Sequence, residues 1–553
     1  MPAAPDRSDG NARIAATLAA HGVRTVFGVP GGGPNLDLVG ACAAAGIGFV
    51  LAHGETAACL MAAAHGAASG TVGVAVVTRG PGLASAVNGL ACATLDGLPL
   101  LLLSDTVPAA DAPRVAHQRV DQVRLTSTVT RYSGVLGGRS PERVDETVAA
   151  ALAVAAGPRP GAVHLDVDLA ADGDPAPAVP VVAGAPAAEQ VERALRLAAG
   201  RRRPLLLVGP LAGDSPGGRG EGATGGPAGG PDRLRAVLAD AGVPVLTTYQ
   251  SAGWVEHDHP DHAGLFTNAA AERPLLEQAD LVVTLGLDPV EPMPGPWRYT
   301  APVLMLHPVP EDGGYFGDPL VVTGDPAGLL DLLAKVLAGA EADWPAGSAA
   351  AQREQSIAAL DPPAGPAASA AGLLPHDVVR AVAAVAPEAL VTVDAGAHML
   401  VVMPLWPARR PGDVLISNGL STMGFALPAA IGAATARPDR RVVCFTGDGG
   451  LGMVLAELET LARLGSRVVV VVFNDARLSL IEIKQRAGQG GPEAVGYRRT
   501  DFAAVAAASG LPGVVACTAA EVADAVRSAD GPLLVDARVD PSVYPHVIRA
   551  TRG

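Results

Sequence analysis

The sequence predicts an α/β protein with three doubly wound domains, each built on a parallel sheet. Short apolar runs that end in glycine turns alternate with stretches whose apolar residues recur at helical spacing. Two segments rich in proline and alanine, 172–187 and 344–373, divide the 553 residues into three parts of ordinary domain size. We therefore expect domains at residues 10–171, 188–338 and 372–540.

Composition limits the kinds of partner. Apolar residues make up 49% of the chain and aromatic residues only 3%, so alanine, valine and leucine must form the interior. The 40 basic and 55 acidic residues give a net charge of -15, and no basic cluster interrupts this excess. A chain of this kind is not expected to bind nucleic acid or an anionic membrane.

The cysteines and the apolar runs bear on the compartment. Five cysteines are scattered and odd in number, which favours reduced thiols over a disulfide framework or a metal site. The N-terminal residues contain no apolar signal region, and no stretch has the eighteen or so apolar residues of a membrane span. We expect an unprocessed, soluble cytoplasmic protein.

The first domain begins with a helix over 12–21 and a strand over 25–29, which ends at Pro30 and Gly31. A second strand, 48–52, leads to Glu55 at the start of a helix over 56–68 that is almost free of charge. An acid in this position is either a partner for the helix dipole or, because its neighbours are apolar, a carboxyl whose pKa is raised for proton transfer. The residues alone leave both interpretations open.

The unit of strand and glycine turn recurs twice more in this domain. A strand over 72–78 ends at Thr78 and leads to Gly80, with Asn88 on the helix that follows, and a strand over 98–104 precedes a loop that contains Gln118. Asn88 and Gln118 are equally well interpreted as surface amides.

The central domain is predicted as another parallel α/β unit. Strands are expected at 205–208, 243–246, 281–285 and 303–306, and helices at 232–241 and 271–278. The low-complexity segment 213–231 is expected to be a surface loop. The turn after the first of these strands lacks the paired glycines of a dinucleotide fingerprint, so we do not expect FAD.

The third domain is expected to start with a helix over 374–386. A strand over 390–393 precedes Gly396 and His398, and a strand over 415–417 precedes Ser421 and Met423. Taken singly, His398 could be a surface histidine, and Met423 could fill the core as most buried methionines do.

The segment 441–478 carries the strongest chemical signal. A strand over 442–446 ends at Gly447, Asp448, Gly449 and Gly450, and one helix that closes at residue 465 is expected to follow. A valine-rich strand over 468–473 then ends at Asp475. Ligands of parallel sheets lie at the carboxyl ends of the strands, so the two aspartates should converge and bind Mg2+ together with a phosphate group. The alternative is an ordinary turn without a metal.

Taken together, these motifs resemble the thiamine diphosphate enzymes of the acetolactate synthase and pyruvate decarboxylase superfamily. The resemblance covers nearly the whole chain. It rests on the Gly-Asp-Gly turn followed 27 positions later by Asp475, and on segments 27–31, 55, 80–88, 98–99, 117–119 and 419–430.

The resemblance implies a role for individual residues. Glu55 would hold the aminopyrimidine ring nitrogen, Gln118 would face the substrate, and Met423 would separate the two cofactor rings. Asp448, Asp475 and the main-chain carbonyl of Arg477 would hold Mg2+ on the diphosphate. The implied cofactor-binding residues are Pro30, Gly31, Glu55, Thr78, Gly80, Asn88, Gly396, His398, Ser421, Met423, Gly447, Asp448, Gly449, Gly450 and Asp475.

The resemblance also implies the activity, which is decarboxylation of a 2-oxo acid followed by carboligation to a second carbonyl compound. Asp475 stands where the commoner motif has asparagine, and residues 483–485 lack the tryptophan of biosynthetic acetolactate synthases, so the flavin-independent catabolic type is favoured. A non-oxidative decarboxylase of a larger or anionic 2-oxo acid is the main alternative, because His117, Arg119 and Lys484 could serve a second carboxylate. A non-catalytic homologue that binds the cofactor is another. A homodimer or homotetramer, with each site shared between two subunits, is implied.

Overall fold

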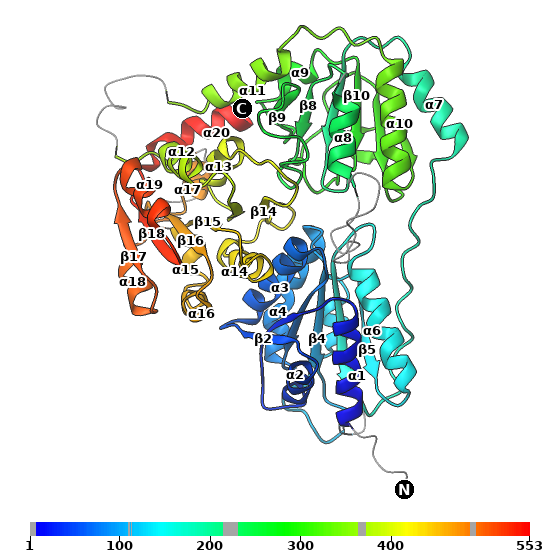
Figure 1. Ribbon diagram of the computed structural model, residues 1–553, viewed down its shortest axis with the longest axis vertical. Helices are drawn as coiled ribbons and strands as arrows, with labels where there is room; N and C mark the ends of the chain where they lie inside the picture. The colour runs from blue at the N-terminus through cyan, green and yellow to red at the C-terminus, as the bar shows by residue number, and fades with distance from the viewer. Residues whose placement is uncertain are drawn as a thin grey trace.

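The computed structural model describes residues 7–108, 111, 113–213, 230–239, 241–362, 372–486 and 494–553. It contains three parallel sheets of six strands each, interleaved with helices (Figure 1). This confirms the predicted fold class. We call the parts of the chain that contain these sheets the first, central and third domains.

The strand order of the first sheet is β2-β1-β3-β4-β6-β5. Its order reverses between β1 and β3, whose carboxyl ends therefore border the crevice where ligands of such sheets bind. The strands are β1 (Thr25–Val29), β2 (Gly48–Leu51), β3 (Gly73–Val77), β4 (Leu100–Asp105), β5 (Tyr132–Gly137) and β6 (Ala162–Asp168). The helices are α1 (Arg7–Ala20), α2 (Asn35–Ala44), α3 (Glu55–Ser69), α4 (Pro81–Leu95), α5 (Gln122–Thr126) and α6 (Pro141–Ala155).

The third sheet repeats this order as β14-β13-β15-β16-β18-β17. Its strands are β13 (Leu390–Val393), β14 (Val414–Ile416), β15 (Val442–Gly447), β16 (Val468–Phe473), β17 (Gly513–Ala516) and β18 (Leu533–Ala537). The helices are α12 (Pro375–Val385), α13 (Met399–Leu405), α14 (Ala426–Ala436), α15 (Asp448–Gly452), α16 (Glu457–Leu464), α17 (Ser479–Arg486), α18 (Phe502–Ala508), α19 (Ala519–Ser528) and α20 (Tyr544–Arg552). The strand pairs β1/β3 and β13/β15 are thus equivalent.

The central sheet has a different order, β12-β11-β10-β7-β8-β9, which reverses between β7 and β10. At that point Gly209 N–H donates to the carbonyl of Leu285 and Leu211 N–H to that of Gly286, each at 2.9 Å. The strands are β7 (Pro204–Val208), β8 (Val245–Thr247), β9 (His262–Leu265), β10 (Leu281–Leu285), β11 (Val303–His307) and β12 (Leu320–Thr323), and the helices α7 (Ala188–Ala198), α8 (Gly230–Leu238), α9 (Arg273–Leu276), α10 (Pro326–Gly339) and α11 (Ser348–Ala358). Most of the predicted low-complexity loop, residues 214–229, lies outside the described residues.

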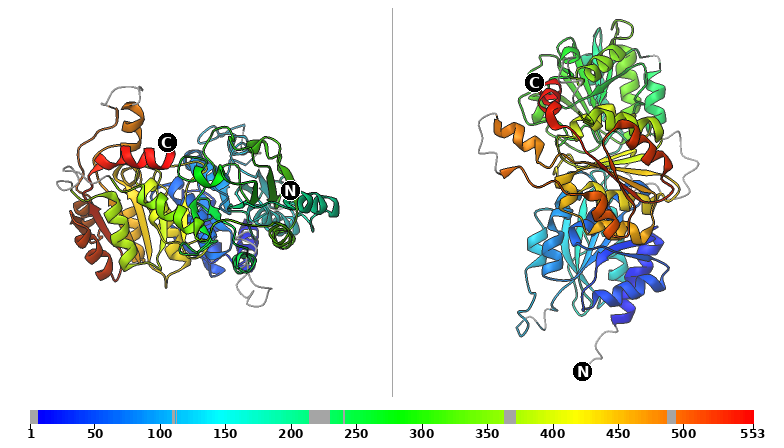
Figure 2. Two further views of the ribbon diagram at one scale, coloured as in Figure 1. Left: turned by 90° about the horizontal axis from the view of Figure 1, so that it is seen from above. Right: turned by 90° about the vertical axis from the view of Figure 1, so that its left-hand side faces the viewer.

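Helices α3 and α14 make the main contact between the first and third domains (Figures 1 and 2). Both are rich in alanine, and both belong to one buried apolar cluster that extends from the first sheet to the third. A Cβ atom on Gly432 would collide with the carbonyl oxygen of Met61, so the two helix backbones approach closely. The interior is built from small aliphatic side chains, as the composition predicts.

Two predictions differ from the structure. The second linker, predicted over 344–373, contains helix α11. The single helix expected after the Gly-Asp-Gly turn is two helices, α15 and α16, separated by residues 453–456. Glycine is a poor helix former, and α15 contains three of them, so the helical spacing of leucines could not sustain one continuous helix.

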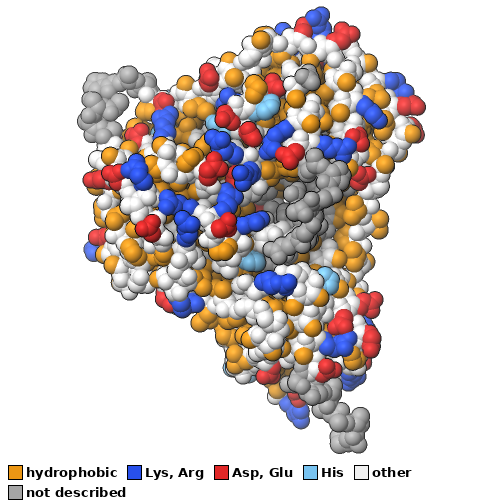
Figure 3. Space-filling model, viewed as in Figure 1, with side chains coloured by type: hydrophobic (Ala, Val, Ile, Leu, Met, Phe, Trp, Pro, Cys, Tyr) orange, Lys and Arg blue, Asp and Glu red, His pale blue; other side chains and the backbone are white. Residues whose placement is uncertain are grey.

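The cysteines and the surface agree with the composition. All five cysteines are free, and four of them are buried. Acidic and basic side chains are interspersed over the face shown in Figure 3. Among the helices of the described residues, none has the length and apolar character needed to cross a membrane.

Candidate active site

Asp448, at the junction of β15 and α15, accepts four hydrogen bonds. Its Oδ2 atom accepts from the backbone N–H groups of Asp475 at 3.1 Å and Ala476 at 2.6 Å. Its Oδ1 atom accepts from Gly449 N–H at 2.7 Å and from the hydroxyl of Tyr497 at 2.6 Å. Because β15 and β16 are neighbours, one carboxylate joins the turns that follow both strands.

The second acid, Asp475, is also buried, with 7% of its surface exposed. Its Oδ2 atom accepts from the Ser479 hydroxyl at 2.5 Å, and its Oδ1 atom from Arg477 N–H at 3.1 Å. Burial, together with the adjacent Asp448 charge, raises the pKa of Asp475 to about 7, and burial also raises the pKa of Asp448. The charge of Arg477 offsets this effect only in part, so the two adjacent buried acids favour a divalent cation beside them.

The backbone between these ligand candidates is strained. Ala476 has a φ of 63°, a left-handed conformation that is uncommon for residues other than glycine. Tyr497 N–H donates to the Ala476 carbonyl, and Leu478 N–H to the Val495 carbonyl. Arg477 lies between these two bonds, and its own N–H donates to Oδ1 of Asp475. The role of the Arg477 carbonyl as a metal ligand stays a prediction.

Tyr497 and Leu478 were not predicted from sequence, yet both line the space above the turn. A Cβ atom at Gly449 would lie 2.6 Å from Leu478 Cδ2, 3.2 Å from Tyr497 Oη and 3.4 Å from Met423 Cε. Met423, predicted to lie between the cofactor rings, thus contacts the same space as the Gly-Asp-Gly turn. Neighbouring side chains therefore occupy the Cβ position of Gly449, and only glycine fits there.

Asp394, at the end of β13, is a further residue that sequence reasoning missed. It is fully buried, and it accepts hydrogen bonds from Phe425 N–H at 3.0 Å and from the Thr446 hydroxyl at 2.8 Å. Burial raises its pKa to about 6. A Cβ atom at Gly450 would collide with the Oδ2 atom of Asp394, so only glycine fits at this position.

His398 is buried, with 4% of its surface exposed, so its interpretation as a surface residue is wrong. Its ring stacks on Phe473 at 5.3 Å, and a Cβ atom at Gly396 or Gly447 would lie 2.8 or 3.3 Å from the ring. Burial lowers its pKa to about 4, which keeps the ring neutral. Its Nε2 atom has no hydrogen-bond partner among the described residues, so it is available to a ligand.

The loop that carries Ser421 and Met423 is held by Asp96, at the end of α4. Asp96 accepts hydrogen bonds from the Ser417 hydroxyl at 2.8 Å, from Gly419 N–H at 2.6 Å and from Gln250 Nε2 at 3.0 Å. Its partners belong to the third and central domains, so we call this contact the three-domain junction. Ser421 itself is exposed and has a φ of 53°.

Glu291 lies beside the three-domain junction. It accepts hydrogen bonds from Asn418 Nδ2 at 2.9 Å and from Gln250 N–H at 3.1 Å, and the Thr248 side chain bonds it too. Burial raises its pKa to about 7, and the charge of Asp96 adds to this effect. Neither acid stood out in the sequence, because their roles depend on contacts between domains.

In the first domain, the predicted residues line the crevice between β1 and β3. Pro30 and Gly31 follow β1, and Thr78 and Gly80 follow β3. A Cβ atom at Gly31 would collide with the Thr78 hydroxyl. Gly80 has a φ of 69°, and its N–H donates to the buried side chain of Gln122 at 2.7 Å. Gln122 was not predicted.

The loop predicted to face the substrate is exposed at residues 117–119. Gln118 has a φ of 57°, and its carbonyl oxygen lies 2.6 Å from where a Cβ atom of Gly80 would be. The backbone of this loop therefore packs against the turn at Gly80, although the side chains of residues 117–119 lie at the surface.

Glu55 is the first residue of α3 and is half-buried. Its Oε1 atom lies 3.3 Å from the position of a Cβ atom on Gly82, in its own domain. Among the described residues, no hydrogen bond joins Glu55 to Asp448 or Asp475. Asn88, which is exposed, does reach the third domain and accepts a hydrogen bond from the Thr422 hydroxyl at 3.0 Å.

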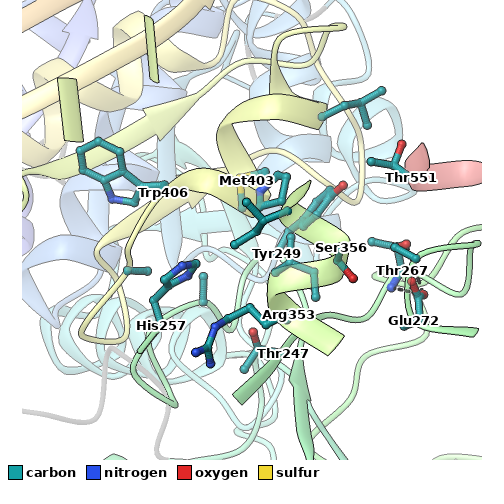
Figure 4. A pocket seen from close by; sticks show the side chains of 18 of the residues that line it. Thr247, Tyr249, His257, Thr267, Glu272, Arg353, Ser356, Met403, Trp406 and Thr551 are labelled. Atoms are coloured by element: carbon teal, nitrogen blue, oxygen red, sulfur yellow. Dashed lines mark hydrogen bonds between the residues drawn. The ribbon is translucent and has the colours of Figure 1, made fainter. Parts of the chain in front are cut away.

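A separate cavity lies between the central domain and helices α11, α13 and α20 (Figure 4). Leu265, Met403 and Trp406 contribute apolar walls, and Tyr249 and Glu272 contribute polar groups. Neither Glu55 nor Asp448 lines it. The cavity is thus distinct from the predicted site.

The residues around Asp448 fit a metal-bound diphosphate on two counts. Two adjacent buried acids favour a cation beside them, and the buried Nε2 atom of His398 has no hydrogen-bond partner among the residues that the structure describes. The assignment of ligands to these residues stays a prediction.

Comparison with known proteins agrees with this geometry. Residues 8–125 match the thiamine pyrophosphate enzyme N-terminal TPP binding domain, and residues 394–537 match the thiamine pyrophosphate enzyme C-terminal TPP binding domain. The catabolic acetolactate synthase of Raoultella terrigena is 32% identical, over 95% of this chain and 94% of that protein. The acetolactate synthase of Bacillus subtilis is 30% identical, over 95% and 92%. The acetolactate synthase isozyme 1 large subunit of Escherichia coli is 29% identical, over 96% and 94%.

Similarity of this extent covers all three domains, including the central one. The two matched segments contain Glu55 on one side and the Asp448–Asp475 pair on the other. The chain therefore belongs to the thiamine diphosphate-dependent enzymes, in the family of acetolactate synthase-like proteins.

Proposed function

We propose that this enzyme uses thiamine diphosphate and Mg2+ to decarboxylate a 2-oxo acid and to join the remaining fragment to a second carbonyl compound. The observation that carries the proposal is the Asp448–Asp475 pair, in which two buried acids from neighbouring strands share one hydrogen-bond network. The relatives named acetolactate synthase support the reaction class.

The third domain anchors the cofactor in this proposal. Asp448, Asp475 and the Arg477 carbonyl would hold Mg2+. The Nε2 atom of His398, which has no hydrogen-bond partner among the described residues, would be available to the diphosphate. Met423, whose Cε atom lies 3.4 Å from the Cβ position of Gly449, would orient the cofactor rings. When bound, the cofactor supplies a nucleophilic carbon and an electron sink.

Glu55 exchanges a proton with the pyrimidine ring nitrogen, which is the step that activates the cofactor. Glu55 is half-buried, and Ala57 and Ala58, which follow it in α3, are buried. Gln118, on the exposed loop, contacts the substrate.

We propose that the site is completed between two copies of the chain, in a homodimer or homotetramer. Within one chain, the carboxyl of Glu55 lies beside Gly82 of its own domain. Large apolar side chains are exposed near both halves of the site, among them Leu51 at 42%, Val120 at 46% and Met453 at 61%. Exposed apolar surface of this kind is typical of an interface.

A second candidate is the simple decarboxylation of a larger or anionic 2-oxo acid. His117 and Arg119 are both exposed on the loop that is seated on Gly80, where their charge could bind a second carboxylate. This reaction would give an aldehyde with no coupled product.

We also propose that the enzyme works without FAD. The loops after β7 and β10 are hydrogen-bonded to each other across the switch point of the central sheet, and the glycine fingerprint is absent. A purified enzyme with a flavin absorption spectrum would contradict this proposal.

The test of the function is incubation of the purified enzyme with thiamine diphosphate, Mg2+ and a panel of 2-oxo acids, with pyruvate among them. Carbon dioxide and the organic products are measured together. Release of carbon dioxide with a coupled product supports carboligation, and an aldehyde alone supports the second candidate. Absence of carbon dioxide from every acid would contradict both.

A further inference from the structure

The turn that precedes Glu55 is held by the third domain of the same chain. Glu457, the first residue of α16, is buried with 2% of its surface exposed. Its Oε1 atom accepts hydrogen bonds from the backbone N–H groups of His53 at 3.0 Å and Gly54 at 3.1 Å. Its Oε2 atom accepts from the Thr460 hydroxyl at 2.8 Å, which fixes the orientation of the carboxylate.

Helix α3 has no cap of its own. Gly54 is the N-cap residue, so no side chain there can accept a hydrogen bond from the first turn. A carboxylate beside the start of a helix also interacts favourably with the helix dipole. Glu457 therefore provides, from another domain, the fixed acceptor that the residues before α3 do not provide.

Two further contacts attach α16 to the same turn. His53 pairs with Glu459 at 2.7 Å, and Arg463 donates to the carbonyl of Leu51 at 2.7 Å. Both contacts involve exposed or half-exposed side chains, whereas the Glu457 contact is buried. Buried hydrogen bonds to a charged group determine geometry more strongly than exposed ion pairs do.

We infer that Glu457 is a positioning residue that sets the orientation of Glu55. It acts through the His53 and Gly54 amides, which directly precede Glu55 in the chain. It also lies nine residues after Asp448, separated from it only by α15 and a short turn. Glu457 thereby links the segment that contains Asp448 to the segment that contains Glu55 within one chain.

This inference rests on the proposed function, in which Glu55 exchanges a proton with the cofactor. If the site is shared between two copies, Glu55 serves the cofactor that the other copy anchors. Glu457 then connects the two sites of a dimer, because it joins the anchor of one site to the acid of the other.

The test uses Glu457→Ala, which removes the acceptor, and Glu457→Gln, which keeps an oxygen at Oε1. Glu459→Gln is the control, since Glu459 lies on the same helix and contacts the same turn. Hydrogen–deuterium exchange of the peptide that contains residues 51–58 is measured by mass spectrometry, together with kcat, KM and the Kd for thiamine diphosphate with Mg2+. Thermal unfolding establishes that each variant is folded.

In Glu457→Ala we expect the 51–58 amides to exchange about tenfold faster, because the His53 and Gly54 hydrogens lose their acceptor. We expect kcat to fall about 10- to 100-fold, which is the scale of a 1 Å misplacement, with the cofactor Kd nearly unchanged. Glu457→Gln should recover most of both properties, and Glu459→Gln should resemble the wild type.

Wild-type exchange and kcat in Glu457→Ala would overturn the inference, and so would an equal loss in Glu459→Gln. A loss of cofactor affinity that matches the loss of kcat would also overturn it, because it would place the effect at the anchor. The exchange measurement needs no substrate. If no 2-oxo acid is turned over, the proposed function fails while the effect of Glu457 on the turn is still measured.

Discussion

The hydroxyl of Tyr497 lies 2.6 Å from Oδ1 of Asp448 and donates a hydrogen bond to it, across 49 positions of sequence. The carboxylate is thus enclosed by groups from three segments: its own turn, the turn after β16 and the segment that contains Tyr497. Its geometry is fixed before any ligand binds.

Replacement of Asp475 tests the anchor. Asp475→Ala removes one carboxylate ligand, and we expect Mg2+-dependent cofactor binding to weaken about 100-fold. Asp475→Asn keeps an oxygen ligand but removes one negative charge beside the diphosphate, so it should retain binding and depend less on the metal. Calorimetric titration of Mg2+ at fixed thiamine diphosphate measures both. Exhaustive chelation should release the cofactor from the wild type, and its retention would contradict the metal assignment.

Glu55→Gln tests the proton transfer. The amide keeps the size of the side chain but cannot donate a proton in the same way, so we expect kcat to fall about 10²- to 10⁴-fold with little change in cofactor Kd. Glu142→Gln, also in the first turn of a helix of this domain, is the matched control. Undiminished turnover by Glu55→Gln would refute the role of this residue.

The glycines of α15 give a paired test of packing. A Cβ atom at Gly450 would collide with the buried carboxylate of Asp394, whereas a Cβ atom at Gly452 would have no other atom within 4 Å. We expect Gly450→Ala to lower the free energy of unfolding by about 1–3 kcal/mol. Gly452→Ala should change it little or raise it by about 0.4–1 kcal/mol. Denaturant unfolding of the two variants side by side checks this, and equal effects would contradict the contact.

Glu291 predicts a dependence of stability on pH. Its pKa is about 7 in the folded protein and near 4.5 in the unfolded chain, so the unfolded state loses this proton first as the pH rises. The stabilising contribution of Glu291 is therefore fully present below about pH 4.5. It is lost as the pH rises through 7, which lowers the free energy of unfolding by up to about 3 kcal/mol. In Glu291→Gln we expect this slope between pH 5 and 8 to be smaller. Asp96 faces the same group and titrates too, so the slope should be reduced rather than abolished.

Asp96→Ala tests the three-domain junction. It leaves Gly419 N–H, Gln250 Nε2 and the Ser417 hydroxyl without their acceptor, and we expect a loss of about 2–4 kcal/mol in the free energy of unfolding. Activity should fall as well, because the loop with Met423 loses its support. Asp318→Ala, at an exposed position, is the control for removal of an acid. Thermal unfolding and kcat of the two variants are compared.

Sequence reasoning predicted the parts of the site that depend on strand ends. Asp448 and Asp475 lie together because parallel neighbouring strands finish at one edge of a sheet, which follows from topology alone. The glycine turns after β1, β3, β13 and β15 were predictable for the same reason. The roles of these residues as ligands stay predictions.

Residues whose roles depend on tertiary contacts could not be predicted in this way. The number of residues between Tyr497 and the aspartates matches no helix or strand repeat. In sequence, Asp96 looks like any acid at the end of a helix. The burial of His398 depends on Phe473 from another strand. The break between α15 and α16 follows from the local glycines, whereas the leucine spacing alone predicts one continuous helix.

The contact between α3 and α14 has an unusual consequence for how the enzyme tolerates mutation. Alanine occupies 13 of the 26 positions of these two helices, and at those positions truncation of the side chain removes almost nothing. A larger side chain at this contact is not tolerated in the same way, because its added methylenes would push one helix backbone away from the other. Gly432→Ala, a change of one methyl group, would already place a Cβ atom 2.0 Å from the carbonyl oxygen of Met61, so it would push α14 of the third domain away from α3, which begins with Glu55. The spacing of the first and third domains at this contact is therefore set by the small size of these residues.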